Sequence, residues 1–317
     1  MIDLFRSELL RARSRRILPM MLVGGVLLIV VAMVIAGANS HKPTPAEIAS
    51  AQAAFQKQFA SCMQGQFLGP GAQLPPGYTS LAQFCADQAA PNVETGLQFR
   101  DLALVIEHSG TFVVLLGVAL AASLGGADWS AGTMTTLLTW EPRRIRVLLV
   151  RALVVALLVA VVTLLLQGVL MGTFSLAVAL RGTSLGAPPG LVGTAVQTAL
   201  RVSTVSVGFG LVALSVATIG RSTVAGLGVL FGYLVLFEGV IAGFRPSIQD
   251  RLLVRAGGVI VSQQPIYDQG PGSFSSNGSF TQPPVLLGLT EAWVVAAVYL
   301  VVLMVLALLV FRARDVN

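Results

Sequence analysis

The stretch ILPMMLVGGVLLIVVAMVIAG occupies positions 17 to 37 and contains no charged residue. A helix rises about 1.5 Å per residue, so about 20 apolar residues reach across the hydrocarbon core of a bilayer. This stretch meets that length. The apolar core of a secretory signal peptide is shorter, at about 7–15 residues. We therefore expect a membrane-spanning helix that is retained as an anchor.

Five further apolar stretches follow along the chain and bring the number of candidate spans to six. They occupy positions 108–126, 152–180, 202–220, 222–244 and 291–311. Of the 317 residues, 55% are hydrophobic and 11% are charged, whereas soluble domains carry about 25% charged residues. The composition therefore predicts an all-α polytopic membrane protein with six transmembrane helices.

The ionisable and reactive residues argue against several classes of protein. A net charge of +6 is common in nucleic-acid-binding proteins, but here the basic residues flank apolar runs. Membrane topology explains them, so we expect membrane lipid and no nucleic acid as a partner. Two histidines and two cysteines without ligand spacing predict no metal site. The same inventory offers no Ser/His/Asp arrangement, so we expect no catalytic residue.

The arginines predict the orientation, because cytoplasmic loops carry an excess of positive charge. With the N-terminus inside, four short inner segments hold most of the 20 basic residues of the chain. They are Arg6, Arg11, Arg13, Arg15, Arg16, Arg143, Arg144, Arg146, Arg151, Arg221, Arg312 and Arg314. An even number of spans returns the C-terminus to the same side. We expect an N-in/C-in, multi-pass protein of the plasma membrane in a bacterial cell.

The spans divide the chain into five parts. Residues 1–37 hold an N-terminal interfacial helix and the first span. Residues 38–107 form an extracytoplasmic helical loop. Residues 108–244 hold spans two to five, with an inner loop at 126–146. Residues 245–287 form a second extracytoplasmic stretch, with a first half that could lie on the membrane surface and an irregular second half. Residues 288–317 hold the last span and a cytoplasmic tail.

The first extracytoplasmic loop has the signals of a small helical hairpin. Thr44-Pro45-Ala46-Glu47 is a capping box with proline at the first helical position. Cys62 and Cys85 lie in the same loop, on the side of the membrane where disulfides persist. We expect them to pair, with a stabilisation of roughly 3 kcal/mol from the closed loop.

Two polar residues lie inside predicted spans and are candidates for a translocation path. Gln167 is in the third span and Glu238 is in the fifth. Polar groups are costly in the bilayer, so each is a functional hypothesis by default. The alternative for Gln167 is an interhelical hydrogen bond. The alternatives for Glu238 are an ion pair with Arg245 or a position at the outer membrane interface.

The inner loop at 126–146 is predicted to be helical as far as Trp140, before Glu141-Pro142 breaks the helix. Its tryptophans, leucines and arginines suit either an interfacial anchor or a docking surface. The residues that carry the pattern are Asp128, Trp129, Gly132, Thr133, Leu137, Leu138, Pro142, Arg143 and Arg144. An acidic residue, Gly-Thr, Leu-Leu and then Pro-Arg-Arg resembles the ABC-2 family of ATP-binding-cassette permeases, although the family more often has Glu where this chain has Asp128.

Three other segments extend this resemblance. The C-terminal Arg314-Asp315-Val316 is similar to the family's ending, and the basic N-terminal segment is similar to its connecting helix. The stretch after the fifth span resembles its external re-entrant helices.

The resemblance implies a permease subunit of an ATP-driven transporter, expected to be an exporter that works by alternating access. No G-x-x-x-x-G-K-[ST] motif occurs, so the chain is not expected to be an enzyme or to hold a cofactor of its own. ATP and Mg²⁺ would be bound by separate ABC ATPase subunits that dock on Asp128, Trp129, Gly132, Thr133, Leu137, Leu138, Arg143 and Arg144. A second permease subunit, identical or homologous, would complete the path.

Two other functions remain open from the residues alone. One is a membrane binding or sensory protein whose extracytoplasmic hairpin recognises a ligand. The other is a secondary transporter, although no internal repeat of the kind common in such transporters is visible. The substrate also stays open among drugs, lipids, peptides and polysaccharides.

Overall fold

The structure is a computed structural model of the whole chain. It describes residues 2–64, 80–89, 96–133, 139, 143–241, 244, 246–267, 273–274, 280–281 and 285–313. Within these residues, six helical segments are long and apolar enough to cross a membrane. The prediction of an all-α polytopic membrane protein is confirmed at this level.

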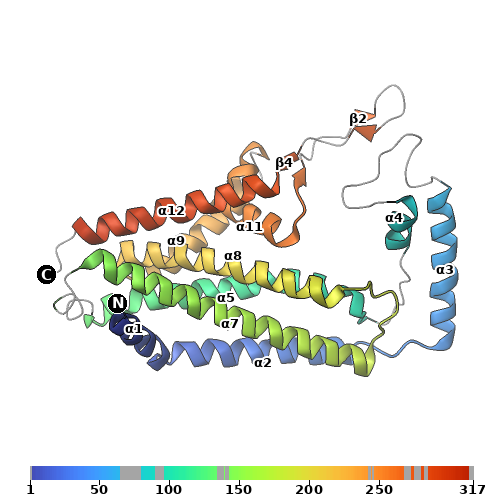
Figure 1. Cartoon of the computed structure of the whole chain (residues 1–317), viewed down its shortest axis with the longest axis horizontal. Coiled ribbons are helices and arrows are strands. Elements are labelled where there is room, and N and C mark those ends of the chain that lie inside the picture. The colour runs from blue at the N-terminus through green and yellow to red at the C-terminus, as the bar shows by residue number, and fades with distance from the viewer. Residues whose placement is uncertain are drawn as a thin grey trace.

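The spanning segments run side by side in one bundle (Figure 1). They are α2 (Ile17–Ala38), α5 (Leu102–Ser130), α7 (Arg144–Arg181), α8 (Leu191–Gly220), α9 (Thr223–Tyr233) with its π-helical continuation η2 (Leu234–Ile241), and α12 (Leu289–Ala313). Both termini lie at the same end of the bundle (Figure 1). A short helix, α1 (Ile2–Ser14), lies at that end and leads into α2.

Several spanning helices are longer than the sequence predicts. The third, α7, begins at Arg144 rather than near position 152, and α8 begins at Leu191 rather than near 202. The second, α5, begins at Leu102 and continues to Ser130. A prediction that ends a span at the first charged residue stops too early, because Asp128 and Arg151 are buried inside the bundle and pair there.

Helices α5, α7 and α8 form the centre of the bundle. Glycines on α5 let the neighbouring helices approach closely, since a side chain at Gly117 would meet Val159 of α7 and Ser206 of α8. The outer helices α2, α9 and α12 are different. Only 11% of the most apolar window of each is buried within the chain, against 56–61% for the central three. Their outward faces are therefore open to lipid or to another chain.

The chain after the fifth span turns back into the bundle. A 3₁₀ segment, η3 (Pro246–Arg251), leads to α11 (Leu253–Ser262). Ala256, Val259 and Ile260 of α11 are buried against Val202 and Val205 of α8. The sequence left open a helix lying on the membrane surface or a re-entrant helix here, and the structure buries one face of residues 253–262 against α8. The amphipathic pattern of α11 does not distinguish the two arrangements, because a helix needs one apolar face whether that face is buried against lipid or against other helices.

Short strands follow α11. Strand β1 (Ile266–Tyr267) pairs antiparallel with β4 (Val285–Leu287), and β2 (Ser273–Phe274) pairs antiparallel with β3 (Phe280–Thr281).

The predicted helical hairpin is present at the end of the bundle opposite the termini (Figure 1). Helix α3 (Pro45–Met63) begins with the predicted capping box at Thr44 and Glu47. Helix α4 (Leu81–Gln88) follows, and the backbone N–H of Gln83 donates to the Ser80 hydroxyl at its start. Beyond it, η1 (Phe99–Asp101) leads into α5.

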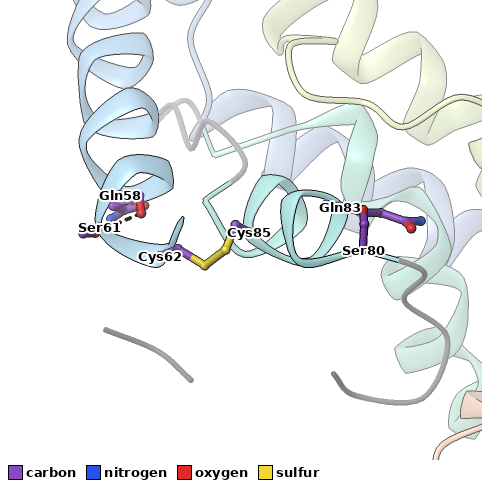
Figure 2. Close-up of a disulfide and its surroundings, with 6 residues drawn as sticks. All are labelled: Gln58, Ser61, Cys62, Ser80, Gln83 and Cys85. Carbon is purple, nitrogen blue, oxygen red and sulfur yellow. Dashed lines mark hydrogen bonds between the residues drawn. A yellow bond between two sulfur atoms is a disulfide. The ribbon is translucent and has the colours of Figure 1, made fainter. Parts of the chain in front are cut away.

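A disulfide joins the two hairpin helices. Figure 2 shows the bond between Cys62, at the end of α3, and Cys85 in α4. The two Cα atoms are 5.6 Å apart, and both side chains are buried with Phe84. The predicted pairing is confirmed. It holds together a unit whose own hydrophobic cluster is small.

Candidate functional site

A cluster of charged side chains joins α1 to the bundle at the end where both termini lie. It consists of Glu8, Arg11 and Arg15 from α1 and its exit, Asp128 from α5, and Arg151 from α7. We call it the charge cluster. Arg151 donates from Nε to Glu8 Oε2 at 3.2 Å and from Nη2 to Asp128 Oδ2. Arg15 donates to the other oxygen of Asp128, and Arg11 lies 3.5 Å from Glu8.

Three members of the charge cluster are buried, while Arg15 is half-buried and Arg11 is exposed. The exposed fractions are 5% for Glu8, 7% for Asp128 and 3% for Arg151. Charges out of water are tolerated only when they are paired, and removing one partner costs about 3–5 kcal/mol. Each carboxylate here faces at least two guanidinium groups, and Arg15 also donates to the carbonyl of Ser123 at 3.3 Å. The arrangement therefore holds α1 in one position against α5 and α7.

Trp129, the residue after Asp128, contacts the other side of the bundle. Its ring meets Phe311 of α12 edge-on, with ring centroids 6.0 Å apart. The Arg221 guanidinium, in the turn between α8 and α9, lies 4.9 Å from the Trp129 ring centroid, which is a cation–π contact. Val147 and Leu148 of α7 complete the same hydrophobic cluster.

Gly126 brings the end of α5 against the turn between α8 and α9. A Cβ atom at this position would lie 2.1 Å from the backbone nitrogen of Thr223 and 2.5 Å from the carbonyl carbon of Ser222. Only glycine permits this approach between backbones. We call Gly126, Asp128 and Trp129 the α5 hub. Within four positions it contacts α1, α7, the α8–α9 turn and α12.

Four other residues of the predicted docking loop lie among the described residues. Gly132 has a φ of +67°, which suits a turn at the end of α5. The Thr133 hydroxyl donates to Asp128 Oδ1 at 3.3 Å. Arg143 and Arg144 stand at the start of α7, where Arg144 donates to the Arg312 carbonyl at 3.4 Å.

Two of the predicted docking residues cannot be placed, since Leu137 and Leu138 lie outside the described residues. Trp129 was predicted to contact an ATPase directly. The Trp129 ring packs between Phe311 and Arg221 within the bundle and is only partly buried, so its contact with an ATPase stays a prediction.

The two candidate path residues lie apart from the α5 hub. Gln167 is 1% exposed in the middle of α7, and neither side-chain amide atom has a hydrogen-bond partner among the residues that the structure describes. Glu238 accepts a hydrogen bond from the backbone N–H of Val254 at 2.7 Å, at the start of α11. The expected partner Arg245 lies outside the described residues. Glu238 therefore holds the N-terminus of α11 to the fifth span.

Sequence reasoning did not single out Glu8, Arg151, Arg221 or Gly126. It used Arg151 and Arg221 only as topology markers. Arg151 carried a usable signal, because it stands one turn beyond the basic cluster and directly against an apolar run. A charge in that position needs a buried partner, and Asp128 and Glu8 are the nearby acidic candidates. Gly126 carried no signal that separates it from the other glycines.

No protein-family model matches the chain, and no curated protein matches its sequence significantly. In the part of the chain that the structure describes, no group of three or more histidine, cysteine, aspartate or glutamate side chains is placed to hold a metal ion.

Proposed function

We propose that this chain is the permease subunit of an ATP-driven transporter of the ABC-2 type, working as an exporter in a bacterial plasma membrane. The termini would face the cytoplasm and the α3–α4 hairpin the outside. This orientation accounts for the arginines gathered at the end that holds α1 and the start of α7. It also puts the disulfide between Cys62 and Cys85 on the oxidising side.

One observation carries the proposal, and it is the position of the α5 hub. The hub forms the start of the 126–146 loop that was expected to dock an ATPase, and we propose that residues 131–143, which follow the hub, make the contact. Packed interiors transmit displacement rather than absorbing it. Asp128 would pass a push on this segment to α1 and α7, and Trp129 would pass it to α12 and the α8–α9 turn. Asp128 and Trp129 would then relay force, while the segment after them makes the contact.

The energy would come from a separate subunit. The chain has no phosphate-binding loop, so ATP and Mg²⁺ would be bound by an ABC ATPase beneath the cytoplasmic end. A second permease, identical or homologous, would face one of the outer helices α2, α9 and α12, whose outward surfaces the chain itself leaves open. Closure of the ATPase dimer would move the docking segment of each permease. This movement would open the path first to one side of the membrane and then to the other.

The test is co-purification of an ATPase with the tagged chain from native membranes, followed by ATP turnover. Replacing both Leu137 and Leu138 with aspartate should put unpaired charge into the docking contact and remove the ATPase from the complex. Ala53 and Ala54, both exposed on α3, give the matched control, since the same two aspartates there should change neither quantity. A Leu137→Asp, Leu138→Asp chain that folds and keeps a normally active ATPase contradicts the proposal.

The second candidate is a membrane binding or sensory protein, and the disulfide-linked hairpin favours it. A small unit stabilised by a cross-link at the far end of the bundle is a suitable receptor for an external ligand. The two functions differ in what they require at the end of the bundle that holds both termini. Only the transporter needs an ATPase at residues 131–143, so the aspartate variants separate them.

A further inference from the structure

A cavity of about 300 Å³ lies between α5, α8 and α11, near the residue where α5 begins. We call it the α5–α11 cavity. Its wall on α5 is a single stripe, because Glu107, Thr111 and Val114 are spaced at i, i+4 and i+7 and share one face of the helix. Its wall on α11 includes Gly258, where a Cβ atom would meet no atom within 4 Å. The two helices therefore leave a space of the size that a small ligand needs.

Two polar side chains of α5 line this cavity without a partner. Glu107 is half-buried, and among the residues that the structure describes its carboxylate has no ion pair and no hydrogen bond. In the same part of the chain the Thr111 hydroxyl also lacks a hydrogen bond. Thr163 and Thr173, which lie within α7, instead donate to the carbonyl one turn before them. The Glu107 carboxylate and the Thr111 hydroxyl are therefore both available to a ligand.

His108 supplies the third polar group of the α5–α11 cavity. Its Nδ1 lies 2.8 Å from the Leu104 carbonyl of its own helix. A carbonyl oxygen only accepts, so Nδ1 carries a proton, and in the neutral ring Nε2 is left as an acceptor. The carboxylate, the hydroxyl and this nitrogen together offer hydrogen-bond acceptors and one negative charge. A primary ammonium ion is complementary to them, because it has a positive charge and three N–H donors.

We propose that the α5–α11 cavity binds a primary ammonium compound with a compact apolar body. The ammonium group lies at Glu107 and Thr111, and the apolar body lies against Phe209 and Val261, which line the same cavity. A body no larger than an aromatic ring with a short alkyl arm suits this volume, which is at the lower end of the range for ligand pockets. As a statement about the transporter's substrate, the inference rests on the proposed function. Binding itself needs only this chain.

The test measures binding of radiolabelled phenethylammonium to the whole chain in nanodiscs of phosphatidylcholine, a lipid whose head group has no N–H donor. This probe joins a primary ammonium group to one aromatic ring. Its trimethylated analogue keeps the positive charge but loses every N–H donor, and phenethyl alcohol keeps the ring without the charge. Each of these two competitors should bind about tenfold more weakly than the probe, a ratio that corresponds to about 1.4 kcal/mol.

Two variants locate the site, and each has a matched control. Glu107→Gln removes the charge and should weaken the probe to the level of phenethyl alcohol. Glu291→Gln makes the same change at an exposed residue of α12 that does not line the cavity, and it should bind the probe normally. Gly258→Leu puts a side chain into the cavity and should abolish saturable binding. Gly172→Leu on α7 also has open space at its Cβ atom but lies away from the cavity, so it should leave binding unchanged.

Equal competition by the trimethylated analogue and the unlabelled probe overturns the proposal, as does normal binding of the probe by the Glu107→Gln chain or by a monodisperse Gly258→Leu chain. A final arm adds phosphatidylethanolamine, whose head group is also a primary ammonium. If this lipid displaces the probe, the occupant is a membrane lipid and the assignment to a free compound is overturned. No ATPase is present in any arm, so failure here leaves the proposed function standing, and loss of ATPase docking leaves this site standing.

Discussion

At the scale of single residues, Asp128 has the strongest effect that can be predicted. Its two carboxylate oxygens receive Arg15 and Arg151, and it is 7% exposed. Asp128→Asn keeps the shape but leaves two arginines short of a counter-charge, so the chain should lose about 3–5 kcal/mol of stability. The thermal melting temperature in detergent measures this. Asp101→Asn is the control, because the Asp101 side chain is 41% exposed and its contact with Arg100 is at the surface. Equal melting of the two variants would show that the charge cluster is not formed.

Gly126 gives a second prediction at this scale. Gly126→Ala would bring a methyl group to 2.1 Å from the backbone nitrogen of Thr223, and neither backbone can withdraw without moving a whole helix. The variant should lose most of its monodisperse fraction in detergent. Gly168→Ala in α7 makes the same change where nothing lies within 4 Å, and it should be neutral or slightly stabilising. Normal behaviour of Gly126→Ala would mean that α5 does not approach the α8–α9 turn so closely.

At the scale of elements, the start of α3 should respond to pH. Hydrogen bonds from the Thr44 backbone, the His41 side chain and the Thr44 hydroxyl lower the pKa of Glu47 from 4.5 to about 2. A carboxyl whose pKa is depressed by folding stabilises the folded state above its ordinary pKa. That contribution is lost as the pH falls from about 4.5 to about 2. Amide exchange in the first turn of α3 should therefore show weaker protection at low pH. The Glu47→Gln chain should lack this dependence, and identical pH profiles would refute the capping box.

The elements also differ in how well the sequence predicts them. Thr44 and Glu47 predict the start of α3 correctly, because a cap depends on residues adjacent in the chain. The packing partner of α11 was not predicted, since Leu253–Ser262 has an apolar face that fits lipid as well as α8. The charge cluster was missed for a related reason. Glu8 and Arg151 come together across the bundle, and the pattern within each segment does not identify a partner in another helix.

At the scale of the whole molecule, the number and order of the spans follow from the sequence, because the bilayer sets the length of each apolar run. The way in which the spanning helices pack against one another cannot be predicted from the sequence in the same way. The central position of α5, α7 and α8 depends on small residues that face one another, such as Gly117 against Ser206. Single glycines and serines occur throughout the chain, so composition cannot identify the ones that meet. The orientation across the membrane is likewise an inference from charge, and it calls for a direct test.

Two serines at opposite ends of the molecule provide that test. Ser14 ends α1 at the arginine-rich end, and Ser50 lies in α3 of the hairpin; both are exposed. The two native cysteines are joined in the disulfide, so an introduced cysteine would be the single free thiol. Ser50→Cys should react with a membrane-impermeant maleimide in intact cells. Ser14→Cys should react only after the membrane is permeabilised, because the excess of arginines predicts that this end faces the cytoplasm. The opposite labelling would invert the protein, put residues 131–143 outside the cell and leave no place for an ATPase on them.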